Sequence, residues 1–193
     1  MSARTPLVLL VIAALLLGYV LLFERGRPGQ TETEARKGLL VEGLVRGRIT
    51  RIRVGSGDRG TVLRREGEGF DETWTIEGPE ESPADPEKVE DYVRNWEFAV
   101  PVRTLESPSP EDRTLFGLDS PRGEVTFEMG EAAVRVTLAS GAPVDGGGYV
   151  QIDDERAVSV VGKDVVSLFE RTPDSFAAKT NAPTLEDLDE ESP

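Results

Sequence analysis

The hydrophobic pattern divides the chain into an apolar start, a body of short alternating segments and a polar end. The start is the most uniform part: from Leu7 to Phe23 it reads LVLLVIAALLLGYVLLF, without one charged side chain. As a helix this run would be roughly 26 Å long, which is within the range that spans the hydrocarbon core of a bilayer. The pattern therefore predicts a single transmembrane helix that contacts lipid through Leu7 to Phe23, with residues 1–25 as a membrane anchor.

Two alternatives remain open for this segment. A cleaved signal peptide normally has a shorter apolar core and a small-x-small cleavage site, and residues 19–25 offer no such site. Basic residues behind the span outnumber those before it, which favours a cytoplasmic body, whereas the short amino tail and the long following domain favour export. We expect an uncleaved, single-pass anchor with the body on the outer side of the membrane. Protease access in intact spheroplasts would decide between the two orientations.

Three strand-type segments and one helix follow a linker in the first half of the body. Residues 26–38 have no hydrophobic period and contain glycine, proline and polar residues, which is typical of a juxtamembrane linker. Period-two alternation then predicts strands at 48–54, 61–66 and 74–77. Asp85 and Pro86 suit the N-cap and the first position of a helix. The apolar residues that give this helix its sheet-facing stripe are Val89, Tyr92, Val93 and Trp96.

The second half of the body repeats this order after a short helical bridge that begins at Pro110. Two alternating segments are expected to form a hairpin, followed by two strands and a helix: 124–129, 134–138, 149–152, 157–161 and 164–170. We therefore predict an α+β domain over residues 39–171, with antiparallel sheets built from two strand-meander-plus-helix units, 39–105 and 110–171. Residues 172–193 are predicted to be an acidic disordered tail, and a partner-binding role of this tail is an alternative.

Composition narrows the chemistry that the body can perform. The formal net charge of −14 argues against a nucleic-acid partner. The sequence contains no cysteine and no histidine, so it lacks disulfides, thiolate metal sites and the commonest general base. We therefore expect no catalytic residues, no metal and no cofactor, and we predict that the protein is not an enzyme.

Two short motifs invite a binding interpretation that their context does not favour. Residues 55–60 form a literal G-x-G-x-x-G, but a strand-type segment follows them instead of a helix, so a hairpin loop is expected. Asp145 and the acids at 153–155 are the nearest approach to a calcium site, and their spacing does not match an EF-hand. Both acidic segments are interpreted as turns.

Aromatic side chains are the residues most suited to a contact surface for another protein. The candidates are Trp96, Phe98, Phe116 and Tyr149. For an aromatic on the apolar face of a helix, such as Trp96, a place in the core is the commoner outcome.

Several short motifs together resemble one protein family. They are LFGLDSP at 115–121, GGGYV at 146–150, TRI at 50–52, WTI at 74–76 and the end of the apolar segment at 19–26. In this combination the chain resembles the domain-of-unknown-function family 4340, with Phe116 where tyrosine is usual. The resemblance implies an N-terminal membrane helix and an association with bacterial ABC-type export systems of the gliding-motility kind. It transfers no catalytic residues.

The leading functional hypothesis is a non-enzymatic, membrane-tethered envelope domain in the bacterial inner membrane, with a periplasmic body. It would serve as an accessory or interaction subunit of a membrane complex, with a membrane-protein partner such as an ABC-type permease. The alternative is a module that binds envelope glycan or a small ligand, with the loop from Gly141 to Gly148 as its rim. An envelope hydrolase is a third, less favoured hypothesis.

Overall fold

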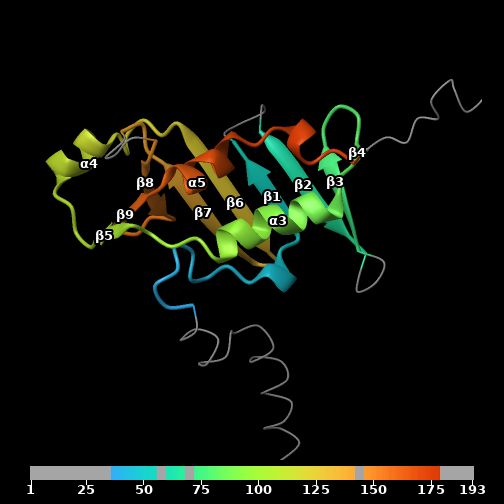
Figure 1. The fold of residues 1–193 in the computed structure, drawn as a ribbon, viewed down its shortest axis with the longest axis horizontal. Coiled ribbons are helices and arrows are strands. Elements are labelled where there is room, and N and C mark those ends of the chain that lie inside the picture. Colours follow the sequence, from blue (N-terminus) through green and yellow to red (C-terminus); the bar gives the residue numbers. More distant parts are fainter. Residues whose placement is uncertain (1–35, 56–59, 68–71, 142–145, 179–193) are drawn as a thin grey trace, which may run out of the picture. The chain divides into compact units, whose positions relative to one another are not determined.

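A nine-stranded antiparallel sheet forms the body, with helices on one of its faces (Figure 1). The computed structural model describes residues 36–55, 60–67, 72–141 and 146–178. The strands are β1 Arg51–Val54, β2 Thr61–Glu66, β3 Thr73–Glu77, β4 Ser82–Pro83, β5 Arg103–Leu105, β6 Gly123–Met129, β7 Ala132–Leu138, β8 Gly148–Ile152 and β9 Val158–Val161. The α-helices are α3 Pro86–Glu97, α4 Pro110–Phe116 and α5 Lys163–Val166, and the 3₁₀-helices are η1 Arg46–Arg48, η4 Ser167–Glu170 and η5 Pro173–Ser175.

The two predicted meanders are joined in the middle of this sheet. The strand order is β4-β3-β2-β1-β6-β7-β8-β9-β5, so β1 of the first meander pairs with β6 of the second. At this junction Ile52 lies opposite Phe127. The predicted α+β class with antiparallel strands is confirmed, but the prediction of separate sheets is wrong. Pairing β1 with β6 removes two exposed strand edges, which explains why one sheet forms.

Strict alternation separates a core face of the sheet from a charged face. Along β6, Val125, Phe127 and Met129 are buried beneath α3, α5 and η4. The opposite face carries ion pairs that cross the strands, including Arg51 to Glu77 at 2.8 Å and Arg53 to Glu128 at 3.1 Å. Arg53 of β1 is therefore paired with Glu128 of the adjacent strand β6, whereas Arg51 of β1 reaches across β2 to Glu77 of β3.

The local helix signals are confirmed. In α3 the side chain of Asp85 accepts a hydrogen bond from the Glu87 backbone N–H at 3.0 Å, and Val89, Tyr92, Val93 and Trp96 are buried. In α4 Ser109 and Asp112 form a capping box, and Gly117 closes the helix in the left-handed region. The helix expected at 164–170 is the short α5 followed by the 3₁₀-helix η4.

The first residues of the segment predicted to be a disordered tail, 173–178, are packed on the body instead. Residues 173–175 form η5, Phe176 is 1 % exposed in the core, and Ala177 forms a β-bridge with Ala84. The apolar Phe176 supplies burial that the acidic residues further along cannot, so the chain stays on the sheet up to Ala178. The remaining predicted tail, 179–193, lies outside the described residues.

Several other predictions also fall outside the described residues. The predicted anchor 1–25, most of the linker, the interior of the glycine loop at 56–59, and Asp145 are among them. The described part of the chain contains no helix long and apolar enough to cross a bilayer. The hairpin interpretation of residues 55–60 is confirmed by its flanking strands, because Val54 of β1 pairs with Thr61 of β2.

Candidate interaction surface

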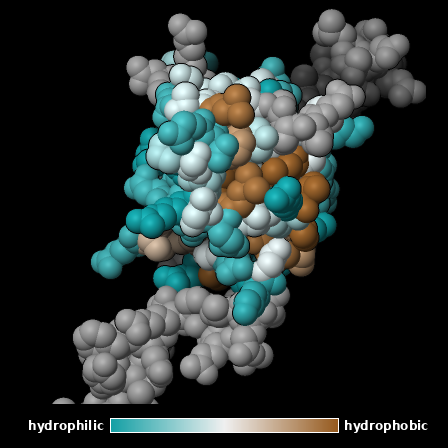
Figure 2. Space-filling model, turned by 90° about the vertical axis from the view of Figure 1, so that its left-hand side faces the viewer, coloured by the Kyte–Doolittle hydropathy of each residue, from teal (hydrophilic) through white to brown (hydrophobic). Residues whose placement is uncertain are grey.

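The strongest candidate surface lies where α3 passes the chain to the edge strand β5. Phe98 ends the helix, and its backbone N–H still donates to the carbonyl of Arg94 at 3.1 Å. From this helix end onward, large apolar side chains are exposed: Phe98 by 64 %, Val100 by 60 % and Val102 by 72 %. Ala99, between the first two, is buried. We call the three exposed residues the apolar row. Figure 2 shows a hydrophobic area at this end of the molecule, and contiguous apolar surface of this kind marks contact sites.

Backbone hydrogen bonds hold the segment of the apolar row in place. The carbonyl of Ala99 accepts from the Leu40 N–H at 2.7 Å, and the Val102 N–H donates to the carbonyl of Val160 at 2.8 Å. Pro101 restricts Val100, the residue before it, to an extended backbone. The outward direction of these side chains is therefore fixed by the fold, because the backbone on both sides of Pro101 is tied to the body.

The row leads into an open sheet edge. Within the described residues β5 pairs only with β9, through Arg103, Thr104 and Leu105. No other described strand pairs with its outer side, and backbone groups at such an edge can accept an additional strand. An edge strand beside exposed apolar side chains is the arrangement that peptide-binding sheets use.

Two hollows flank the loop that follows β5. One, of about 390 Å³, is lined by Leu105, Glu106, Ser107, Pro108, Asp112 and Phe116. The other, of about 460 Å³, is lined by Ser107, Pro108, Pro110, Arg113, Asp154, Glu155 and Arg156. The first hollow has two acidic residues and no basic residue in its lining, so it favours a basic side chain. Leu115 of α4, 77 % exposed, adds a further apolar residue at this end of the sheet.

Only one of the four aromatic candidates is well exposed. Trp96 is 0 % exposed and packs edge-on against Phe127 and Phe169, with ring centroids 5.8 and 5.1 Å apart. Its prediction as a surface residue is wrong, because it occupies the last position of the α3 stripe that faces the sheet. Phe116 is buried and stacks on the half-buried Tyr149 at 4.1 Å.

Phe98 is the aromatic that remains at the surface, and its neighbours were missed. Val100, Val102 and Leu115 were not singled out from the sequence. The available signal was an apolar residue at every second position directly after a helix, without a polar residue between them. Such a run normally faces a core, so the sequence alone did not separate it from an internal strand.

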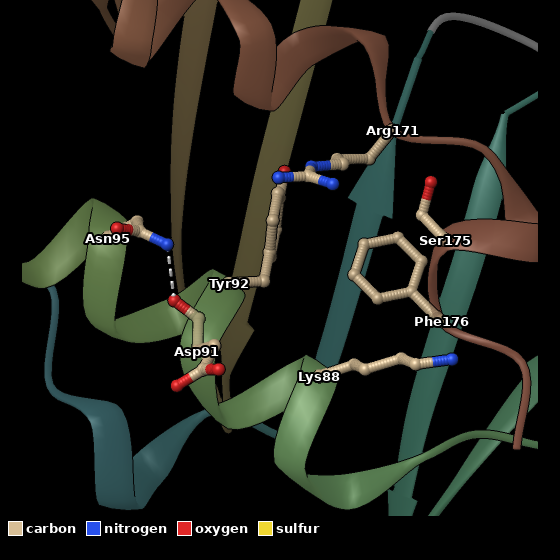
Figure 3. Close-up of a pocket in the computed structure, with 7 residues that line it drawn as sticks. All are labelled: Lys88, Asp91, Tyr92, Asn95, Arg171, Ser175 and Phe176. Atoms are coloured by element: carbon tan, nitrogen blue, oxygen red, sulfur yellow. Dashed lines mark hydrogen bonds between the residues drawn. The ribbon is translucent and has the colours of Figure 1, made fainter.

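A third, smaller hollow lies between α3 and the C-terminal segment (Figure 3). Its volume is about 170 Å³, and it is lined by Lys88, Asp91, Tyr92, Asn95, Arg171, Ser175 and Phe176. The Tyr92 hydroxyl donates to the carbonyl of Leu168 at 3.2 Å, and Lys88 Nζ donates to the carbonyl of Ala177 at 2.7 Å. Burial raises the pKa of Tyr92 well above its ordinary value, although the Trp96 side chain and the charge of Arg171 oppose the rise.

The polar side chains of this hollow hold neighbouring segments of the chain together. Because burial raises the pKa of Tyr92, its phenol stays protonated at neutral pH. Both side chains donate to backbone carbonyls, so Tyr92 fastens η4 to α3 and Lys88 fastens the C-terminal segment to it. A volume of about 170 Å³ is also below the range usual for ligand pockets. Among the residues that the structure describes, no group of three acidic side chains is placed to hold a metal ion.

Comparison with models of known protein families gives a match. A family model described as Domain of unknown function (DUF4340) matches residues 74–190. The chain belongs to the DUF4340 family. The resemblance drawn from the short motifs is thereby confirmed, although the motifs at 19–26 and 50–52 lie before the matched range. No curated protein and no solved structure matches the chain.

In this DUF4340 member the motif at 115–121 has a structural role. Gly117 has φ of +78°, and a Cβ atom there would collide with the hydroxyl of Ser140. The Gly141 N–H donates to the carbonyl of Phe116 at 2.9 Å, and Thr114 Oγ1 donates to Asp119 Oδ2 at 3.0 Å. The motif thus fastens α4 to the chain that follows β7, next to the two hollows. It positions the candidate surface and brings no reactive group to it.

Proposed function

We propose that the DUF4340 domain of this protein is a non-enzymatic interaction module. It is tethered to the bacterial inner membrane through Leu7 to Phe23, with the body in the periplasm, and acts as an accessory or interaction subunit of a membrane complex. The observation that supports this best is the open β5 edge, which combines unpaired backbone with two adjoining hollows and an exposed Leu115. The membrane tether is supported by the apolar sequence alone.

The partner that fits this edge is an extended segment of a membrane protein. Such a segment adds a strand to β5, so that main-chain hydrogen bonds provide affinity and side-chain contacts provide specificity. A basic side chain on it would lie in the hollow that contains Glu106 and Asp112. The resemblance to proteins of bacterial export systems suggests an ABC-type permease as the partner.

Site-specific photocrosslinking in cells tests this function. A photoreactive amino acid is placed in the full chain at Thr104 or Leu115, with Ser82 on the opposite edge strand as the matched control. All three positions are exposed. We expect Thr104 and Leu115 to form an adduct with the same membrane protein and Ser82 to form none. Glu106→Lys should reduce the yield several-fold, because it reverses the charge of the acidic hollow.

The contradicting result is equally direct. If Thr104 and Leu115 give no protein adduct, or only the adducts that Ser82 gives, the β5 edge is not the contact surface. If the adduct forms but Glu106→Lys leaves its yield unchanged, the strand-addition site stands and the basic contact is wrong.

A ligand-binding module is the second candidate. The hollow that contains Arg113 and Arg156 has a volume of about 460 Å³, which is within the usual range for ligand sites. The rim predicted at 141–148 is described only at Gly141 and from Gly146 onward. Calorimetric titration of the full chain with soluble peptidoglycan fragments tests this alternative. Saturable binding that Arg156→Ala weakens would favour it over strand addition.

A further inference from the structure

The apolar row lies beside the point where the N-terminal part of the chain joins the body. The compact unit of the body begins at Gly38. Two residues later, Leu40 binds the carbonyl of Ala99, the residue between Phe98 and Val100. Residues 1–37 are therefore attached directly next to the most exposed large hydrophobic side chains of α3 and its connection to β5.

The covalent connection limits how far this end can lie from a bilayer. Residues 24–37 separate the predicted span from Gly38, and a fully extended chain of that length covers about 50 Å. A body held within this distance meets the membrane at a high effective concentration. A contact too small to recruit a protein from solution can then orient one that is already tethered.

We propose that Phe98, Val100 and Val102 insert into the interfacial region of the bilayer to which the chain is anchored. This inference rests on the tether of the proposed function, but not on the protein partner. An aromatic and two branched aliphatic side chains match the apolar contact that interfacial proteins make with lipid. Insertion of the apolar row holds the adjoining β5 edge at the membrane surface, where a segment of a membrane protein can reach it.

The contact is with the apolar part of the interface, and not with anionic headgroups. The three side chains of the apolar row carry no charge, and the formal net charge of the chain is −14, so this contact does not depend on attraction to a negative surface. We therefore expect insertion into purely zwitterionic lipid, with little dependence on ionic strength. An electrostatic contact would show the opposite behaviour, because salt screens exposed charges.

Fluorescence quenching in proteoliposomes tests the inference on the full chain. Because the sequence contains no cysteine, Val100→Cys gives a single labelling site for an environment-sensitive fluorophore. The labelled protein is reconstituted in phosphatidylcholine vesicles, with or without lipids that carry a nitroxide near the top of the acyl chain. We expect a blue-shifted emission and at least twofold quenching at Val100. Ser82→Cys, exposed at the opposite edge of the sheet, is the matched control and should show neither.

A second variant tests whether the row causes the insertion. Phe98→Cys is labelled in a chain that also carries Val100→Lys and Val102→Lys, both at exposed positions where folding should be unaffected. We expect the quenching at Phe98 to fall to the level at Ser82.

Each outcome bears on one part of the proposal. If the chain floats with the vesicles but Val100 is quenched no more than Ser82, the lipid contact is wrong and the tether stands. If, in addition, a photoreactive residue at position 100 is crosslinked to a protein in cells, the apolar row contacts that protein and not lipid. If the vesicles float without the chain, the tether and the lipid contact both fail. Quenching at Val100 together with no crosslink at Thr104 would keep the lipid contact and overturn the strand-addition function.

Discussion

The two edges of the sheet are finished in different ways. At the β4 edge the strand has two residues, one of them Pro83, and the C-terminal segment lies against it. The Asp85 N–H donates to the carbonyl of Phe176 at 2.7 Å, and the Ala178 N–H donates to the carbonyl of Pro83 at 3.2 Å. At the β5 edge no described segment lies outside the strand, and apolar side chains precede it.

This difference identifies the edge that is available to a partner. Proteins protect sheet edges by short strands, proline and covering segments, since a bare edge pairs with other chains. Among the described residues, the C-terminal segment covers the β4 edge and no segment covers the β5 edge. The β4 edge is covered, so this fold is able to protect a sheet edge. The bare β5 edge therefore favours a role in binding.

The largest effect is expected from breaking the covered edge. Phe176 is 1 % exposed and packs edge-on against Tyr92, with ring centroids 5.1 Å apart. Phe176→Ala should lower the free energy of unfolding by about 3–5 kcal/mol, because it leaves a cavity under the segment. Urea unfolding of the full chain in a mild detergent, followed by tryptophan fluorescence, measures this.

The matched control for this change lies at the end of α3, in the segment that leads to the open edge. Phe98→Ala removes the same side chain from a position that is 64 % exposed, so the loss should stay within about 0.5 kcal/mol. Similar losses for both variants would mean that the two edges do not differ in the way described.

A smaller loss is expected where α4 is fastened near the open edge. Gly117→Ala should cost roughly 2–4 kcal/mol, from a left-handed backbone and a collision with Ser140. Gly130→Ala is the control: its φ is also positive, at +72°, but no atom lies within 4 Å of the added Cβ. It should cost about 1 kcal/mol. Equal losses at both glycines would show that the close approach to Ser140 contributes nothing.

The comparison of the edges also shows which parts of the fold follow from local sequence. The cap of α3 at Asp85 and the alternation of β6 and β7 involve neighbouring residues, and both were predicted. The pairing of β1 with β6 joins strands far apart in the chain. No local pattern encodes which edge a strand will join, so the single sheet was not predicted.

Whether an aromatic side chain near the end of α3 is buried or exposed depends on where this helix ends. Trp96 and Phe98 are two residues apart and both aromatic, yet one is in the core and the other on the surface. Trp96 is inside the last turn of α3, whereas Phe98 is its C-cap. Sequence patterns do not fix the last residue of a helix. The burial of Phe176 was also missed, because it is the single large apolar residue between Phe169 and Leu185.

The smallest effect concerns the tyrosine under the covered edge. Because burial raises the pKa of Tyr92, the folded protein keeps this proton at a pH where the unfolded chain, with a pKa of about 10, releases it. Above about pH 10 the unfolded state binds fewer protons, so the free energy of unfolding falls by up to about 1.4 kcal/mol per pH unit. Below that pH this group causes no change.

Tyr92→Phe should remove this part of the pH dependence. At pH 7 the variant should lose about 1 kcal/mol, because the carbonyl of Leu168 loses its hydrogen-bond donor. Between pH 10 and 11 the two proteins should converge, since only the parent protein must keep a buried phenol neutral while its unfolded state ionises. Urea unfolding at pH 8, 10 and 11 measures both slopes. If the free energy of unfolding falls with pH equally steeply in both proteins, groups other than Tyr92 cause the loss of stability at alkaline pH. Tyr92 would then not titrate as its burial beneath the covered edge predicts.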